Sequence, residues 1–294
     1  MRLFLCTALT MAAFAANSLF NRLAVGSGGI DAASFALVRV LAGAAVLALL
    51  ATMRIAHHGR GARHGSGWPP VTPAAVPGAL GLAVYLAGFS FAYTGLAAGT
   101  GALILFGTVQ ITMFAGAVLR GQRLGQRRVI GAGIAFVGLI MLLWPGDAAP
   151  LALGPVAAMI AAGLGWGIYS LAGATSRDAL AGTAINFMLA VPLMALFWLM
   201  MGAAPLALGP GLWLGILSGA VTSGLGYALW YAILPALGAQ RGAVAQLTVP
   251  LIAAGAGVVI LDETIGLRFA LASLLVLGGV AFASVTARKS VNDT

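Results

Sequence analysis

The chain has 294 residues, of which 61% are hydrophobic and 7% are charged, and its formal net charge is +9 at pH 7. Soluble domains have charges at roughly a quarter of their positions, so this composition excludes a soluble globule and predicts a polytopic membrane protein. The single cysteine, Cys6, excludes an intramolecular disulfide and a multi-cysteine metal site.

Ten apolar stretches follow one another along the chain. In chain order they lie at residues 3–23, 32–53, 74–95, 99–119, 129–144, 152–174, 180–201, 211–234, 242–261 and 268–287. Most approach the ~20 residues that a helix needs to cross the hydrocarbon core. They lack the alternating polarity that marks the strands of a membrane barrel. The sequence therefore predicts an all-α fold of ten transmembrane helices.

The first stretch, residues 3–23, also resembles a secretory signal peptide, because Arg2 precedes it and small residues surround positions 13–16. Cleavage there would leave nine spans and no counterpart for residues 152–174. We therefore expect the stretch to remain as the first helix.

The longest connection, residues 54–73, contains all three histidines, His57, His58 and His64. No carboxylate or cysteine lies near them in the sequence, so we expect a solvated loop, with no metal site and no cofactor. An intramembrane hydrolase or metalloprotease needs a histidine beside its nucleophile or metal. Since the histidines share one loop, we expect that the protein is not an enzyme.

Basic residues predict the orientation of the chain, because they concentrate in cytoplasmic loops. With a cytoplasmic N-terminus, nearly all of the assigned arginines face the cytoplasm. The opposite face receives Arg22, Arg268, Asp31, Asp147, Asp262 and Glu263. We expect a plasma (inner) membrane protein with both termini in the cytoplasm. This asymmetry accounts for the net charge, so we expect contact with lipid and no nucleic-acid partner.

The two halves of the chain are weak copies of each other. Residues 101–138 align without gaps with residues 242–279, with matches such as Gly101/Gly242 and Ile111/Ile252. Five spans per half insert the second copy upside down, which is an architecture of secondary transporters. We therefore predict two repeats, 1–146 and 147–294, that form a 5+5 inverted repeat.

Several motifs in these repeats resemble the EamA domain. They are the run from Gly242 to Pro250, the segment Leu261-Asp262-Glu263 after an apolar helix, and a following helix with Gly278-Gly279. Arg39 also fits an arginine that is usual in the second helix of that family. The domain occurs twice in ten-helix exporters of the drug/metabolite transporter superfamily. The resemblance implies this fold and a transport function, and it extends to the aromatic amino-acid exporters (YddG type).

Aromatic and neutral polar side chains recur on the helices that we expect to face a cavity between the halves. The candidate substrate-binding residues are Trp166, Tyr169, Asn17, Ser18, Tyr85, Gln110, Gln246, Tyr227 and Arg39. Such a lining suits a substrate with an apolar body and a few hydrogen-bonding groups, as in a bulky neutral amino acid. By the resemblance, Trp166 takes the place of a cavity tryptophan.

Some of these assignments leave alternatives open. Gln110 and Gln246 lie inside apolar stretches, where an amide needs a partner on a neighbouring helix or on the substrate. Trp230 or Tyr231 is expected in the aromatic belt at the membrane interface. Arg39 lies about two turns, roughly 10 Å, from the predicted outer end of its helix. Its guanidinium therefore binds a substrate carboxylate, snorkels to the surface, or binds a helix C-terminus.

Small residues and prolines predict where helices approach and bend. Gly211, Gly215 and Gly219 recur every four residues, which should let a neighbouring backbone approach closely. Pro192 and Pro250 lie inside apolar stretches, where each is either a packing bend or a hinge for alternating access.

The acidic residues predict the type of coupling. Proton-coupled carriers commonly use an embedded acidic residue, yet all six acids lie at predicted ends, in loops or in the tail. We therefore predict a monomeric, facilitative carrier that exports neutral or zwitterionic metabolites, including aromatic amino acids, by alternating access. An exporter of other metabolites, drugs or nucleosides is the alternative, and a channel is a further one. Glu263 is expected to be a contact or a cap at the start of the tenth helix.

Overall fold

In the computed structural model, residues 1–59, 68–121, 125–144, 151–173 and 178–284 can be described, and over these residues the chain is helical without a β-strand. The candidate positions Asp147 and His64 lie outside this part. In chain order the helices are α1 (Arg2–Gly26), α2 (Ala32–Gly59), the short 3₁₀ helix η1 (Pro73–Ala75), α3 (Val76–Ala92), α4 (Ala98–Leu119), α5 (Gln126–Leu143), α6 (Leu153–Gly173), α7 (Ala179–Met200), α8 (Pro210–Leu217), the π-helix η2 (Ser218–Leu225), α9 (Gly226–Leu237), α10 (Ala239–Gln246), α11 (Thr248–Leu261) and α12 (Leu267–Ser284).

These elements confirm the ten predicted stretches. Within the described ranges, nine helical segments are long and apolar enough to cross a membrane, and α3 is a shorter apolar helix of 17 residues. The eighth stretch consists of α8, η2 and α9, and the ninth consists of α10 and α11. Large apolar side chains such as Val259 and Leu274 are exposed on the outer faces, where lipid would cover them. The fold is that of an all-α polytopic membrane protein.

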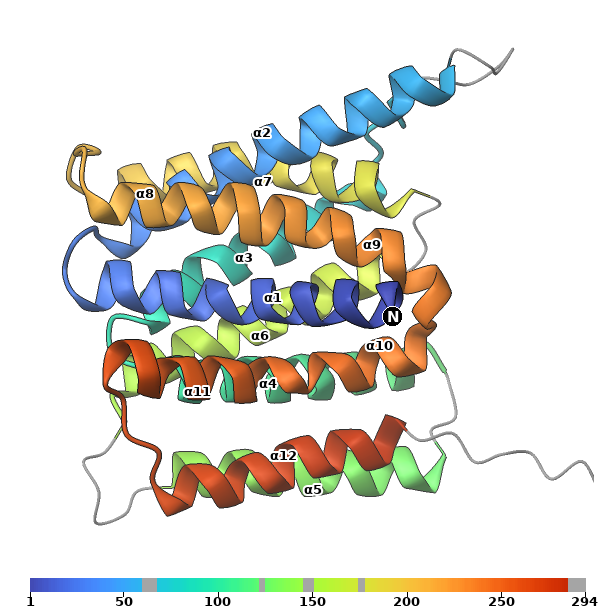
Figure 1. Ribbon diagram of the computed structural model, residues 1–294, viewed down its shortest axis with the longest axis vertical. Helices are drawn as coiled ribbons and strands as arrows, with labels where there is room; N and C mark the ends of the chain where they lie inside the picture. Colours follow the sequence, from blue (N-terminus) through green and yellow to red (C-terminus); the bar gives the residue numbers. More distant parts are fainter. Residues whose placement is uncertain (60–67, 122–124, 145–150, 174–177, 285–294) are drawn as a thin grey trace, which may run out of the picture.

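The helices lie side by side along one direction, with α1 crossing the middle of the bundle and α5 and α12 together at one edge (Figure 1). Several close pairs join helices that hold equivalent places in the two halves: α2 packs on α7, α4 on α11, and α5 on α12. In addition, α3 packs on α6, and α1 packs on α8, η2 and α9. In the two halves, α1 corresponds to α6, and α3 corresponds to the span formed by α8, η2 and α9. Exchanging the halves therefore turns the contact of α3 with α6 into the contact of that span with α1, as expected for a repeat. The division at residue 146 stays a prediction.

Glycines allow the closest approaches between these helices. A Cβ atom added to Gly165 of α6 would lie 2.5 Å from the carbonyl oxygen of Gly81 of α3, and the reciprocal distance is 2.6 Å. A Cβ on Gly219 would likewise collide with the carbonyl oxygen of Arg39 in α2. The predicted close approach along the stripe that includes Gly219 is confirmed, because only a residue without a side chain fits there.

Two irregularities interrupt the second half. The π-helix η2 continues directly from α8 and into α9, and its extra residue per turn shifts the side chains on either side of it. Pro250 lies in the first turn of α11, and its missing N–H leaves the Gln246 carbonyl without the usual helical partner, at the point where α10 ends. Pro192, by contrast, lies within an α7 that continues to Met200.

Candidate substrate cavity

A cavity of about 710 Å³ extends from one end of the bundle toward its middle. Its mouth is bounded by the segment Pro69–Thr72 and by Asp178, at the end of the bundle where the N-terminus lies (Figure 1). Helices α3, α4, α6, α7, α9 and α10 supply its walls. Binding cavities for small molecules commonly have volumes of about 300–1,000 Å³, so this cavity is large enough for a metabolite.

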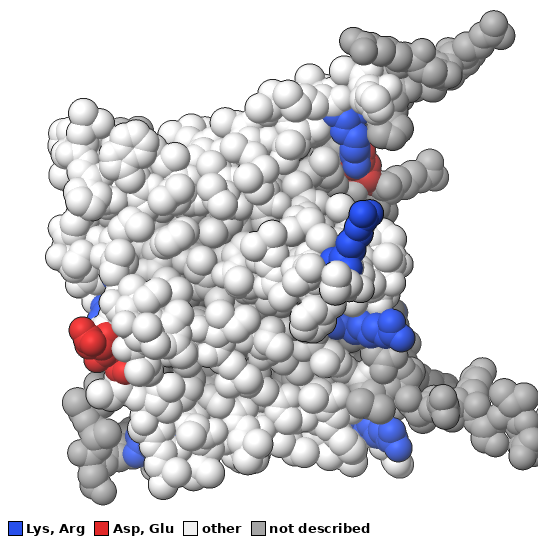
Figure 2. Space-filling model, in the orientation of Figure 1, with Lys and Arg blue, Asp and Glu red and all other residues white. Residues whose placement is uncertain are grey.

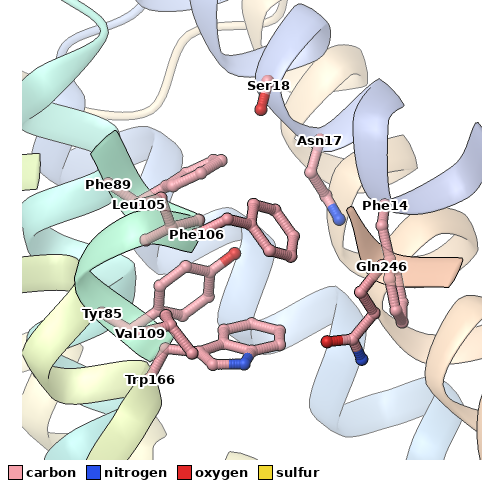
Figure 3. A pocket seen from close by; sticks show the side chains of 10 residues that line it. All are labelled: Phe14, Asn17, Ser18, Tyr85, Phe89, Leu105, Phe106, Val109, Trp166 and Gln246. Atoms are coloured by element: carbon pink, nitrogen blue, oxygen red, sulfur yellow. The ribbon is translucent and has the colours of Figure 1, made fainter. Parts of the chain in front are cut away.

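The deep end of the cavity continues into a smaller chamber. Four side chains line both spaces: Phe14, Val109, Trp166 and Gln246. Figure 3 shows the chamber between α1 on one side and α3, α4 and α6 on the other, with the rings of Tyr85, Phe89 and Phe106 on one wall. The chamber has a volume of only about 20 Å³, enough for roughly one water molecule. In this conformation a substrate therefore fits in the larger cavity.

Trp166 lies at the centre of the aromatic lining. Its ring centroid is 4.4 Å from that of Tyr85, 5.5 Å from that of Tyr227 and 6.0 Å from that of Tyr169. The contact with Tyr85 is edge-to-face, with an interplanar angle of 76°. Each such pair adds about 0.5–1.5 kcal/mol beyond the burial of its area. The wall that a substrate would meet is therefore held rigidly.

Polar atoms in the lining differ in whether they already have a partner. The Tyr169 hydroxyl is 2.9 Å from Thr183 Oγ1. The hydroxyl of Tyr227 and the side-chain oxygen of Asn186 are buried and make no hydrogen bond to the described residues. A buried polar group without a partner costs about 1–3 kcal/mol. Tyr227 and Asn186 are therefore the lining groups best suited to bind a molecule in the cavity.

Asn17 and Ser18 lie on the α1 wall of the chamber. The Asn17 side-chain oxygen accepts hydrogen bonds from Ser218 Oγ at 2.7 Å and from Thr222 Oγ1 at 2.5 Å. Its nitrogen points toward the chamber, and Gln246 lies on the same side of the view as Asn17, across from Tyr85 and Trp166 (Figure 3). Asn17 thus fixes α1 to η2 through its oxygen and leaves its donor end for the chamber.

Gln110 and Gln246 both line the cavity and are half-buried. Of the nine candidate residues, eight therefore line the cavity or its chamber, and Arg39 does not. Three aromatic lining residues, Phe14, Phe89 and Phe106, were not candidates from the sequence, because a phenylalanine in an apolar stretch gives no signal of its own.

Arg39 of α2 lies behind Tyr85 and is 0% exposed. Its Nη2 donates to the Tyr85 hydroxyl at 2.8 Å, and its Nε donates to Ser223 Oγ at 3.2 Å. The guanidinium carbon is 5.1 Å from the Tyr85 ring centroid and 5.0 Å from that of Phe89. Nη1 makes no hydrogen bond within the described structure. Snorkelling to the surface, one of the open alternatives, is wrong, because neighbouring helices cover the side chain completely.

Trp230 or Tyr231 was expected in the interfacial belt, and for Trp230 this alternative is wrong. The side chain is only 7% exposed and lines the cavity. It lies three residues after Tyr227, which is one helical turn, so both residues present their rings on one face of α9. Tyr231 lines the cavity as well, and its hydroxyl is 3.5 Å from that of Tyr169. The three-residue spacing from Tyr227 to Trp230 indicates in the sequence that both side chains face the cavity.

The opposite end of the bundle is closed by a cluster around Glu263. Its Oε2 accepts a hydrogen bond from the backbone N–H of Ala98 at 2.8 Å, and its Oε1 is 3.3 Å from Arg22 Nε. Arg22 also donates to the Tyr93 carbonyl at 3.2 Å. Glu263 therefore caps α4. The expected cap on the tenth predicted span, α12, is wrong. The free N–H groups and positive dipole end of α4 lie within its reach.

An ion pair between Arg54 of α2 and Asp178 lies beside the cavity mouth. Asp178 is the N-cap of α7 and accepts a hydrogen bond from the Ala181 N–H at 3.0 Å. Burial raises the pKa of the Asp178 carboxyl, but the hydrogen bonds from Arg54 and Ala181 and the guanidinium charge outweigh it, so the pKa falls below its usual value. The carboxylate therefore stays ionised near neutral pH.

Comparisons with known proteins agree with this architecture. Residues 153–285 match the model of the EamA-like transporter family. An uncharacterized protein of Pseudomonas aeruginosa is 45% identical over 282 residues, which are 95% of this chain and 93% of that protein. One solved crystal structure is similar over 98% of this chain and 99% of its own, with a TM-score of 0.66 and 21% sequence identity. The last likeness shows a shared fold.

Proposed function

We propose that the chain is a secondary carrier that exports small neutral or zwitterionic metabolites, with amino acids, including aromatic ones, as its substrates, because residues 153–285 match the EamA-like transporter family. The observation that supports this proposal is the cavity, which is large enough for a metabolite, lined by aromatic rings and amides, and open at one end. Aromatic faces provide contact area for an apolar body, and hydroxyl and amide groups fix its orientation.

In this proposal the substrate-binding residues are those that line the two connected spaces. Trp166, Tyr169 and Tyr227 contact the apolar body of the substrate, while Gln110 on α4 and Gln246 on α10 form hydrogen bonds to its polar groups. Asn17, Ser18 and Tyr85 contact the part of the substrate that reaches the chamber when the chamber widens. Arg39 acts on the substrate through Tyr85, because it does not line the cavity itself.

Transport requires a second conformation with the cavity open at the other end, which the two halves would reach by rocking. Breaking the cluster of Glu263, Arg22 and the α4 N-terminus would open that end. Pro250, at the break between α10 and α11, is suited to be a hinge. Pro192 is a weaker candidate, because α7 is continuous there.

The carrier is facilitative in this proposal. Within the described ranges, Asp31, Asp178, Asp262 and Glu263 lie at helix ends or in loops, so none is placed as an embedded proton relay. Accumulation of substrate in proteoliposomes driven by a pH gradient alone would contradict facilitative transport.

We further propose that the chain lies in the plasma membrane with its N-terminus in the cytoplasm and acts as a monomer. Figure 2 shows that on one face the basic side chains gather mainly at the end of the bundle with the cavity mouth, while a cluster of acids lies at the other end. Cytoplasmic loops are rich in basic residues. The cavity would then open to the cytoplasm, where a carrier loads a substrate for export.

The test is counterflow in proteoliposomes with a panel of amino acids, nucleosides and small cationic drugs. Trp166→Ala should abolish or strongly reduce aromatic amino-acid transport, because it removes the centre of the aromatic wall. Trp213→Ala is the matched control, since Trp213 is 60% exposed on α8 and lies outside the cavity lining. Unchanged transport by folded Trp166→Ala would refute the assignment. Transport of drugs or nucleosides alone would favour the alternative substrate class, which the large cavity volume also accommodates.

A further inference from the structure

We propose that the deep end of the cavity recognises a carboxylate group on the substrate through the hydroxyls of Tyr85 and Tyr227, with Arg39 as the positioning residue behind Tyr85. This inference rests on the proposed function and specifies its substrates as carboxylate-bearing molecules. Three features of the structure lead to it: a buried positive charge without a counter-ion, the direction of the Tyr85 hydroxyl proton, and the unpartnered Tyr227 hydroxyl.

The first feature is the charge of Arg39. Where the chain is described, its hydrogen bonds go to the neutral hydroxyls of Tyr85 and Ser223, and neither ion pair includes it. A buried charge that lacks an opposite charge is costly, and the two aromatic rings beside the guanidinium offset only part of that cost. Arg39 therefore makes the deep end of the cavity electropositive, which favours an anionic group there and disfavours a cationic one.

The second feature is the direction of a proton. A guanidinium has five N–H donors and no acceptor, so the Tyr85 oxygen accepts the 2.8 Å hydrogen bond from Arg39 Nη2. The Tyr85 O–H proton is then available to another acceptor. Figure 3 shows the Tyr85 oxygen pointing toward the interior of the chamber. Arg39 thus orients Tyr85 as a donor toward the chamber, into which the substrate reaches when the chamber widens.

The third feature is a second donor nearby. The Tyr227 hydroxyl is buried, lines the cavity and has no partner in the described structure. The Tyr85 and Tyr227 rings both pack against Trp166, so their positions are coupled through one side chain. An ionised carboxylate accepts at two oxygens and forms stronger hydrogen bonds than a neutral acceptor, which suits this pair of donors.

The experiment measures inhibition of L-phenylalanine counterflow in proteoliposomes by three analogues. 3-Phenylpropionate keeps the carboxylate and lacks the amine, phenethylamine keeps the amine and lacks the carboxylate, and L-phenylalaninamide replaces the carboxylate by a neutral amide. We expect 3-phenylpropionate to inhibit at least about tenfold more strongly than either of the other two, because hydrogen bonds to a charged group are the stronger kind. Equal inhibition by all three would overturn the proposal and leave the proposed function standing.

Variants separate recognition from folding. Tyr227→Phe removes one donor without a partner in the folded protein, so the variant should fold and lose most of the tenfold preference. Tyr93→Phe removes a buried hydroxyl that lines neither space and donates to the Ala98 carbonyl, so this variant should keep the preference. Arg39→Gln should lose the preference, and Arg39→Lys should restore part of it, whereas a purely structural role would leave the ratio between analogues unchanged in any folded variant. An unchanged ratio in Tyr227→Phe would refute the inference. If no amino acid is transported or bound, the proposed function itself fails, and this inference fails with it.

Discussion

Arg22 of α1 and Glu263, which follows α11, form an ion pair with Nε and Oε1 3.3 Å apart, at the end of the bundle opposite the cavity mouth. Glu263 simultaneously caps α4 through the Ala98 N–H. One carboxylate thus connects a helix of each half and the N-terminus of a third helix. This is the closed end of the conformation described by the structure, and the ion pair must break if the cavity is to open there.

The first prediction concerns this ion pair. Glu263→Gln keeps a side-chain oxygen for the Ala98 N–H but removes the charge, so the closed end should lose about 1–3 kcal/mol of stabilisation. The thermal midpoint of the purified protein should fall, and a thiol reagent added at that end should react faster with Cys in a Ser18→Cys variant. Asp262→Asn is the control, because Asp262 is exposed and asparagine tolerates its left-handed backbone, φ 53°. Equal reaction rates in both backgrounds would show that Glu263 does not close this end.

The second prediction concerns pH and the Arg54–Asp178 pair. Because the Asp178 pKa in the folded protein lies below its usual value of 3.8, the pair contributes stability above that value and loses it as pH falls through the lowered pKa. The difference in thermal midpoint between the parent and Asp178→Asn should therefore be constant from pH 7 to pH 5. This difference in midpoint should also be small. The pair contributes at most about 1 kcal/mol to the free energy of unfolding, because its side chains are 39% and 35% exposed.

His57 lies one helical turn after Arg54, so both proteins are compared in a His57→Gln background. A midpoint difference that shrinks between pH 7 and pH 5 would contradict the lowered pKa.

The third prediction concerns Pro250. Pro250→Ala restores an N–H group that can bond to the Gln246 carbonyl, so α10 and α11 can join into one straight helix. We expect slower turnover with unchanged substrate affinity, measured as the rate and half-saturation of counterflow. Pro192→Ala should have a smaller effect, because α7 is continuous through that position. Turnover that does not change in Pro250→Ala would argue for a packing bend and against a hinge.

The fourth prediction concerns the packing of α3 on α6. Gly165→Ala places a methyl group 2.5 Å from the Gly81 carbonyl oxygen, and backbone cannot yield as a flexible side chain would. The helices must separate, at a cost of about 1–3 kcal/mol, and the fraction of monodisperse protein that survives heating should fall. Gly133→Ala on α5 has open space around its Cβ position and should survive heating as well as the parent. Equal survival of both variants would contradict the close contact.

Much of the fold could be predicted, because it depends on local features of the sequence. Apolar length located the ten spans, and the four-residue spacing of glycines located the close contact at Gly219. Pro250 marked the break between α10 and α11, since a missing N–H acts within one helical turn. None of these features requires knowledge of which helices are neighbours.

The errors concern contacts between distant parts of the chain. Glu263 caps α4, and its partner Ala98 is 165 residues away in the sequence, so proximity along the chain pointed to the wrong helix. The snorkelling alternative for Arg39 considered only the distance of Arg39 from the end of its own helix. The side chain is buried because η2 and α3 pack against α2. The extra residue per turn in η2 also has no signal in an apolar stretch.

The central claim is that the protein is a carrier for small zwitterionic metabolites. Its most direct test is counterflow of radiolabelled L-phenylalanine into proteoliposomes preloaded with the unlabelled amino acid, with equal pH on both sides. We predict a transient accumulation of label above its external concentration, abolished by Trp166→Ala and retained by Trp213→Ala. Equilibration without an overshoot, together with single-channel currents in planar bilayers, would contradict the account.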